Sequence, residues 1–243
     1  MNRSWDDIAG DPASRMLLIG DHASNHVPDG IALGVWPPLM REHIAIDIGV
    51  APLGRALCGA LGCPGILGGV SRLVIDLNRE DDAPGLIPEK SDGHDIPGNR
   101  DLADTERRAR IDAYWRPYHD HIADRLSEDK PRLLISLHSF TPSLATDSTP
   151  RPWQIGILYN QDDRAARVAL PLLAAAGIIV GDNLPYSGKL LNATMNRHAE
   201  GNRIAYLGIE VRQDLISDAA GVAAWAQKLV PVISHVAHAM GAP

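Results

Sequence analysis

Histidines and acids stand at points of the sequence where apolar runs of strand type end. The run "MLLIG" is followed directly by Asp21 and His22, and the run "RLLISL" by His138. Imidazole nitrogens and carboxylate oxygens together suit zinc, and an open catalytic zinc site takes three such ligands plus a water molecule. His22 and His138 would supply two ligands. Asp47 and His43, four residues apart on one expected helix, are the local alternatives for the third.

Further polar groups follow other expected strands. Asn78 and Arg79 come after "RLVIDL", and Glu210 lies within the apolar run "YLGIEV". A glutamate that is not a ligand can take a proton from the metal-bound water, and an arginine such as Arg79 can hold the oxyanion that forms at an attacked carbonyl. Because a buried carboxylate needs a reason to exist, Glu210 would either pair with Arg212 or Arg79, or act as the general base. We favour the general base.

Several arginines are expected near the same edge of the sheet. Guanidinium groups bind carboxylates through two parallel hydrogen bonds, so a substrate that carries at least one carboxylate is predicted. The alternative for each arginine is an ion pair within the protein, with Asp76, Asp214 or Glu200 as partner. The arginines concerned are Arg72, Arg79, Arg203 and Arg212.

Strand-like and helix-like segments alternate along the chain, which is typical of a layered α/β fold with a largely parallel or mixed sheet. In such folds ligands gather outside the carboxyl ends of the strands. The strands are expected at residues 15–21, 65–69, 72–77, 132–138, 154–159, 177–182 and 204–211. The helices are expected at residues 37–61, 102–127 (with a kink at Pro117), 162–177 and 217–240.

One long polar segment, residues 78–101, separates two of these elements. Its prolines and glycines predict a loop, and a loop of more than about 15 residues inside a compact domain is usually functional or disordered. No linker composition and no internal repeat divides the chain. Residues 1–243 are therefore expected to form one domain.

Composition argues against several classes of function. The net charge is −7 and no basic stripe is present, so a nucleic-acid surface is not expected. No apolar run approaches the roughly 20 residues of a membrane span, and the N-terminus lacks the apolar core of a secretory signal. Cys58 and Cys63 do not have metal-ligand spacing and are expected to be buried thiols. A cytoplasmic location is predicted.

The remaining histidines are interpreted as structural. His119 and His121 are two apart on one helix and are expected on the surface or in packing contacts. His235 and His238 are expected on a solvated helix face. His94, in the polar segment, is not assigned.

Seven motifs in a fixed order give a specific resemblance. The chain resembles the N-formylglutamate amidohydrolase family, in its shorter branch, from about residue 15 to the final helix. That family is similar in fold to zinc carboxypeptidases and aspartoacylases, which implies a three-layer, zinc-exopeptidase-like architecture. The motifs are "GDHASNHVP", "HIAIDIGV", "SRLVIDLNR", "SDGHDIPGN", "SLHSFTP", "PYSG" and "GIEVRQDLI".

The resemblance implies a zinc-dependent hydrolase that splits the amide of a small N-formyl or N-acyl amino acid. It assigns the metal ligands to His22, Asp47 and His138, and the base to Glu210. Zinc carboxypeptidases use an HxxE pair, but here Asn25 stands three residues after His22, so the carboxylate role moves to Asp47. The resemblance also implies substrate contacts for Asn78, Arg79 and Arg212. We expect Arg79 to be catalytic together with Glu210, and the further substrate-binding residues to be Arg72, Ser187 and His198.

Two other interpretations remain beside this one. The site could serve a carboxypeptidase-like or other deacylating hydrolase with a different acyl group. Alternatively, the domain could bind ligands without catalysing a reaction. The two histidines, Glu210 and the Asn78–Arg79 pair argue against the non-catalytic interpretation.

Overall fold

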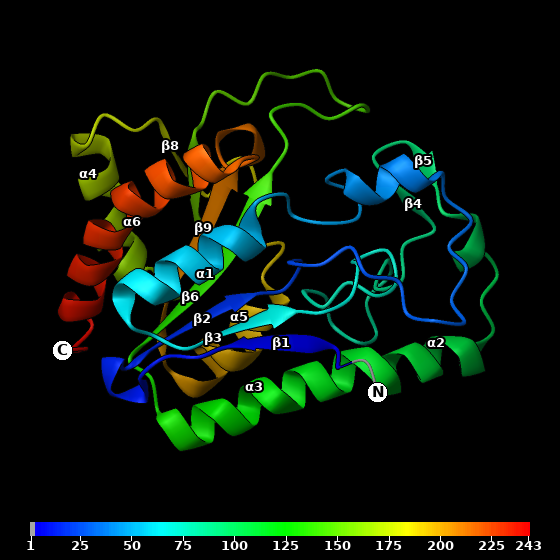
Figure 1. Ribbon diagram of the computed structural model, residues 1–243, viewed down its shortest axis with the longest axis horizontal. Coiled ribbons are helices and arrows are strands. Elements are labelled where there is room, and N and C mark those ends of the chain that lie inside the picture. Colours follow the sequence, from blue (N-terminus) through cyan, green and yellow to red (C-terminus); the bar gives the residue numbers. More distant parts are fainter. Residues whose placement is uncertain (1–2) are drawn as a thin grey trace.

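The computed structural model describes residues 3–243. Its centre is a mixed sheet of seven strands in the order β1-β3-β2-β6-β9-β7-β8 (Figure 1). The strands β3, β2, β6 and β9 are parallel, β1 pairs antiparallel with β3, β7 pairs antiparallel with β9, and β8 is parallel to β7. Their bounds are β1 Trp5–Ile8, β2 Met16–Gly20, β3 Gly65–Gly68, β6 Leu133–Phe140, β7 Ile155–Leu158, β8 Val180–Asp182 and β9 Ala205–Arg212.

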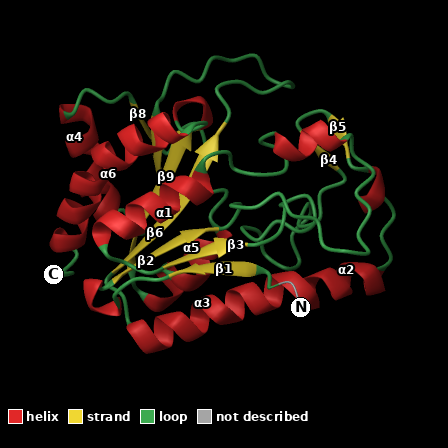
Figure 2. Ribbon diagram, in the orientation of Figure 1, coloured by secondary structure: helices red, strands yellow, loops and turns green. Residues whose placement is uncertain are grey.

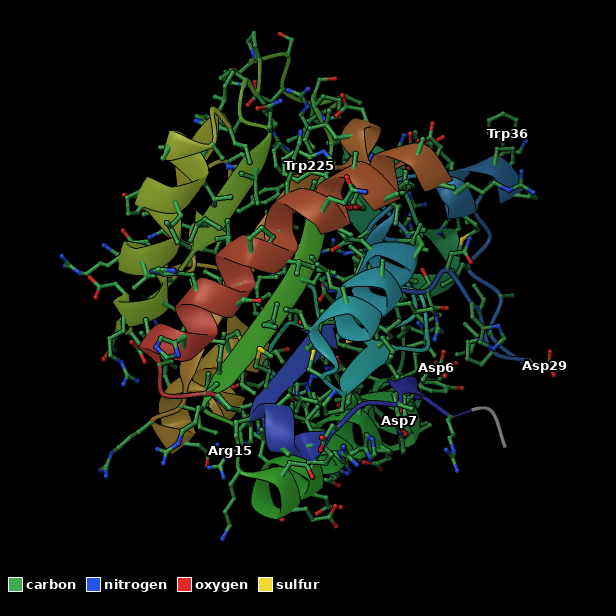
Figure 3. The ribbon with its side chains drawn as sticks, turned by 60° about the vertical axis from the view of Figure 1, so that its left-hand side comes forward. Asp6, Asp7, Arg15, Asp29, Trp36 and Trp225 are labelled. Carbon is green, nitrogen blue, oxygen red and sulfur yellow. The ribbon has the colours of Figure 1, made fainter. Side chains whose placement is uncertain are left out.

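Helices cover both faces of the sheet, so the expected three-layer α/β architecture is confirmed (Figure 2). One face packs against α1 (Val50–Leu61), α4 (Arg164–Ala175) and α6 (Ala219–Ala239), and Trp225 of α6 is buried in this layer (Figure 3). The other face packs against α3 (Arg116–Asp129) and α5 (Ala193–His198). This double cover explains the continuously apolar strands, since Leu17 and Leu18 belong to opposite cores and neither is exposed.

Two expected elements are wrong, and both errors concern segments that carry candidate site residues. The apolar segment 72–77 forms turns, not a strand, and its Leu73, Val74 and Ile75 are buried on the α3 side of the sheet. A short apolar run does not distinguish a strand from a buried loop. The helix expected at 37–61 begins only at Val50, because Gly49 has a φ of 82° that interrupts helical geometry. Asp47 and His43 therefore lie in a loop.

The helix expected at 102–127 consists of α2 (Asp104–Arg110), a π-helical segment (Ile111–Trp115) and α3. Pro117 stands in the first turn of α3, where its missing N–H is tolerated, and the π-helical segment directly precedes it. The polar segment after residue 78 is ordered, with a small hairpin of β4 (Lys90–Ser91) and β5 (His94–Asp95). The Asn99 side chain anchors it by donating to the carbonyls of Leu73 and Pro88.

Cys58 and Cys63 are free buried thiols, as expected. Among the described residues, no helix is both long and apolar enough to cross a membrane.

Candidate active site

A cavity of about 220 Å³ opens where β2, β6 and β9 end at their carboxyl side. In Figure 1 the β2 arrow points toward the loop-rich half of the molecule, and the β6 and β9 arrows point toward the top of the view. The cavity gathers residues from seven separate segments of the chain. Its lining is His22, His43, Asp47, Arg72, Asp76, Asn78, Arg79, Ser136, His138, Ser139, Phe140, Thr141, Leu158, Tyr186, Leu191, Asn192, Gly208, Ile209 and Glu210.

Three buried ligand atoms converge at one end of the cavity. Nδ1 of His138 lies 2.9 Å from Oδ2 of Asp47, and Nδ1 of His22 lies 3.4 Å from the same oxygen. His22 follows β2 directly and His138 lies on β6, the neighbouring strand. Asp47 reaches them from the loop before α1, where its backbone N–H donates to the His22 carbonyl. Together the three residues could hold a metal ion.

The donor set fits zinc. Two atoms bound at about 2.0–2.1 Å to a tetrahedral zinc lie about 3.4 Å apart, close to the distances of the two imidazole nitrogens from Oδ2 of Asp47. Nδ1 of His22 is buried and has no hydrogen-bond partner among the described residues, so its lone pair is available to a cation. Burial alone would raise the pKa of Asp47, but its contacts with His22 and His138 and the positive charge of Arg72 hold that pKa well below its ordinary value. The ligand carboxylate is therefore ionised.

A second layer of carboxylates orients both imidazoles. Nε2 of His22 is hydrogen-bonded to Oδ1 of Asp76 at 2.7 Å, and Nε2 of His138 lies 3.3 Å from Oδ2 of Asp21. A carboxylate on the outer nitrogen fixes the tautomer of a ligand histidine and leaves the other nitrogen free for the metal. Both histidines thus present Nδ1 to the same point.

Asp21 is held in place from the α3 side of the sheet. Its Oδ1 accepts hydrogen bonds from the Tyr118 hydroxyl at 2.8 Å and from the Thr194 hydroxyl at 3.0 Å. The residue is completely buried. Two neutral donors satisfy one oxygen, so the other remains directed at His138.

The two arginines of the cavity differ in how they are bonded. Arg72 bridges two carboxylates, with Nη1 at 3.1 Å from Asp47 and Nη2 at 3.1 Å from Asp76. Arg79 contacts Asp76 only through Nε, at 3.5 Å, and its side chain is 36% exposed. The Asn78 side-chain oxygen accepts from the Thr194 backbone N–H, which leaves its amide N–H₂ available to a ligand. Arg79 and Asn78 thus keep free donors at the cavity.

Glu210 lies on β9 directly beside His138 of β6. It is 8% exposed, and its Oε2 has no hydrogen-bond partner in the described part of the chain. Burial raises the pKa of Glu210 to about 7, against the lowering effect of His138. A carboxyl group beside the metal ligands with a pKa near neutrality can both accept and return a proton.

The remaining candidates lie elsewhere or at the rim. His43 lines the cavity, but its Nε2 is hydrogen-bonded to Asp92 at 2.9 Å. Arg212 binds the carboxylate of Asp214 through Nε and Nη2 and does not line the cavity. Ser187 and His198 do not line it either, and His198 is 3% exposed and paired with His119. Arg203 lies at the opposite end of the strands, just before the start of β9.

Sequence reasoning missed Asp76, Asp21, Tyr118 and Thr194 as supports of the site. Asp76 carried a usable signal, because it precedes Asn78 and Arg79 in the motif "DLNR", and Asp21 is adjacent to His22. The sequence gives no comparable signal for Tyr118 and Thr194, because only the packing of α3 and α5 against the sheet brings them to Asp21.

Comparison with known proteins places this geometry in a family. The sequence model of the family described as N-formylglutamate amidohydrolase matches residues 14–217. The chain belongs to the N-formylglutamate amidohydrolase family. Family membership confirms the resemblance read from the motifs and places the protein among the hydrolases.

Two solved structures resemble this chain over almost its whole length. A gene product from Agrobacterium tumefaciens, known from its crystal structure, is 30% identical in sequence. The match has a TM-score of 0.90 and covers 96% of this chain and 94% of that one. An N-formylglutamate amidohydrolase from Ralstonia eutropha JMP134 is 21% identical, with a TM-score of 0.78, covering 97% of each chain. The second likeness concerns the fold alone. The comparison with curated proteins gave no match.

Proposed function

We propose that this protein is a metal-dependent amidohydrolase that cleaves the amide of a small N-formyl or N-acyl amino acid. The observation that carries the proposal is the convergence of His22, Asp47 and His138 on one point, with Glu210 beside them, in a member of an amidohydrolase family. A divalent cation held by these three residues, with zinc as the best fit, would activate water and polarise the substrate carbonyl.

The residues around that point have complementary roles in the proposed reaction. Glu210 takes the proton of the attacking water and returns it to the leaving amine nitrogen. Arg72, fixed between Asp47 and Asp76, adds positive charge where the carbonyl oxygen becomes negative. Arg79 and Asn78 bind and orient the substrate through their free donors. These roles agree with the bonding of each side chain.

The experiment is a screen of N-formyl and N-acetyl amino acids that measures the released acid. The purified protein is tested after zinc loading, after chelation, and after zinc is restored to the chelated sample. Hydrolysis that disappears with the chelator and returns with zinc supports the proposal. Equal turnover by the chelated protein, or no hydrolysis of any compound by the zinc-loaded protein, overturns it.

The metal assignment has a separate test that does not depend on activity. His22→Ala combined with His138→Ala removes both nitrogen ligands, so elemental analysis should find the zinc content reduced to background. His235→Ala, an exposed site on α6, is the control for the loss of a histidine and should retain zinc. Full zinc occupancy in the double variant would exclude this site.

A further inference from the structure

The charges that line the cavity are unevenly available to a ligand. Arg72 already bridges two carboxylates, and the His43 imidazole is hydrogen-bonded to Asp92. Among the described residues that line the cavity, Arg79 is the guanidinium whose two Nη atoms make no hydrogen bond. A free pair of Nη groups matches one carboxylate. The cavity therefore offers one carboxylate-binding fork.

The arginines outside the cavity do not supply a second fork. Arg212 is engaged by Asp214. Arg151 donates from Nη1 to the Thr141 carbonyl and to the Tyr186 hydroxyl, and its guanidinium stacks 5.0 Å from the Tyr186 ring. Arg151 is thus held behind Tyr186, which itself lines the cavity.

Another part of the cavity wall is apolar. Leu158 on β7 and Leu191 line it, and Leu191 is 40% exposed, whereas the Ile209 side chain is buried in the core on the α1 side of the sheet. A carboxylate placed against such a wall would lose hydration without gaining a partner, which is unfavourable. An uncharged side chain would instead gain from burial there.

We infer that the substrates of this site carry one carboxylate, bound by Arg79, and an uncharged side chain against the wall of Leu158 and Leu191. This inference rests on the proposed function and narrows it, because it excludes acidic amino acids such as N-formylglutamate as the preferred substrates. The single free fork and the apolar wall are its two independent observations.

The direct test compares kcat/KM for N-formyl-L-glutamine and N-formyl-L-glutamate, which have the same shape and differ in one charge. N-formyl-L-methionine is the apolar third substrate. The glutamine and methionine compounds should be hydrolysed at least about tenfold more efficiently than the glutamate compound, since tenfold corresponds to about 1.4 kcal/mol. An equal or higher kcat/KM for the glutamate compound overturns the inference.

Variants test which side chains bind the α-carboxylate and which contact the substrate side chain. Arg79→Gln should raise KM for all three substrates by a similar factor, because all three share the α-carboxylate. Leu191→Arg adds a cation at the apolar wall and should increase the ratio of glutamate to glutamine turnover. Leu190→Arg is the matched control, since Leu190 is 84% exposed and does not line the cavity, and its ratio should equal that of the wild type. An unchanged ratio in Leu191→Arg contradicts the placement of the side chain.

A binding measurement separates this inference from the proposed reaction. Calorimetry with free glutamine, methionine and glutamate reports affinity for the product amino acids without turnover. Weaker binding of glutamate than of the other two supports the inference even if no formyl compound is hydrolysed, a result that would overturn only the proposed reaction. Tighter binding of glutamate that is lost in Arg151→Gln would assign a second carboxylate site to Arg151 and refute the inference.

Discussion

A buried pair of histidines under the active site predicts a measurable loss of stability in mild acid. His119 of α3 and His198 of α5 are 4% and 3% exposed, and Nδ1 of His119 lies 2.9 Å from Nε2 of His198. Nε2 of His119 lies 3.0 Å from the Leu77 carbonyl, which can only accept. Nε2 of His119 therefore carries the proton, and Nδ1 accepts from His198. Both rings are neutral in this arrangement.

Burial, reinforced by the proximity of His198, lowers the pKa of His119 to about 3. Burial likewise lowers the pKa of His198 to about 4, and Arg197 adds to this effect while Asp21 opposes it. In the unfolded chain both histidines titrate near about 6.5. The unfolded state therefore binds more protons below pH 6.5, so stability is fully present above that pH and decreases as the pH falls toward the folded pKa values.

The magnitude follows from these pKa values. Between pH 7.5 and pH 5, each histidine should reduce the free energy of unfolding by about 2 kcal/mol, and the pair by about 4 kcal/mol. That is a large fraction of the roughly 5–15 kcal/mol by which domains are stable. Glu210, whose pKa burial raises to about 7, adds stability as the pH falls through this window and opposes the pair, so the contribution of the pair is measured as the difference between the wild type and a histidine variant.

The assay is urea unfolding at several pH values between 5 and 7.5, for the wild type and for His119→Gln. The variant cannot be protonated at position 119, so its loss of stability between pH 7.5 and pH 5 should be about 2 kcal/mol smaller than that of the wild type. His235→Gln, on the exposed face of α6, is the control for removing one histidine. If the wild type and His119→Gln lose the same free energy over this range, the neutral buried pair is refuted.

Three further predictions concern the active site. Glu210→Gln should fold and retain metal, but its kcat should fall by about 10²- to 10⁴-fold. Glu128→Gln, on the exposed side of α3, is the control and should keep the wild-type kcat. Near wild-type turnover in Glu210→Gln would exclude Glu210 as the base. Asp76→Asn removes the charge that orients His22 and should weaken metal affinity about 10- to 100-fold in chelator competition. Asp82→Asn, at an exposed position, is the control. A metal affinity of Asp76→Asn equal to that of the wild type would contradict a role of Asp76 in orienting His22. An N-formyl amino acid should have a higher kcat/KM than its amide because Arg79 binds the carboxylate, and equal values would reject that contact.

The general architecture was predictable because apolar runs and helical periodicity alternate clearly along the chain. Helices on both faces follow from strands such as β2, whose apolar residues are continuous. The family was predictable from the ordered motifs, which cover most of the chain. These features depend on local sequence, so no knowledge of tertiary contacts was needed to recognise them.

The loop around Asp47 and the turns at residues 72–77 were not predictable in the same way. Leu73 and Ile75 look like strand residues, but they are buried in a loop that Asn99 and Arg110 fix by donating to the carbonyls of Leu73 and Val74. Those partners come from distant segments. The free or engaged state of each arginine also depends on such contacts, which is why Arg212 and Arg79 could not be distinguished by type or spacing alone.

The sheet order determines when the active site can be completed during synthesis. His22 and Asp47 are joined by a backbone hydrogen bond, but β6, which carries His138 and pairs with β2, is made only after more than half of the chain. Glu210 arrives last, on β9, shortly before α6. Parallel pairing between strands so far apart in sequence is slow to form. A nascent chain therefore acquires its metal ligands before its base, and a chain that is cut short before β9 would keep the three metal ligands and lack the group that moves the proton.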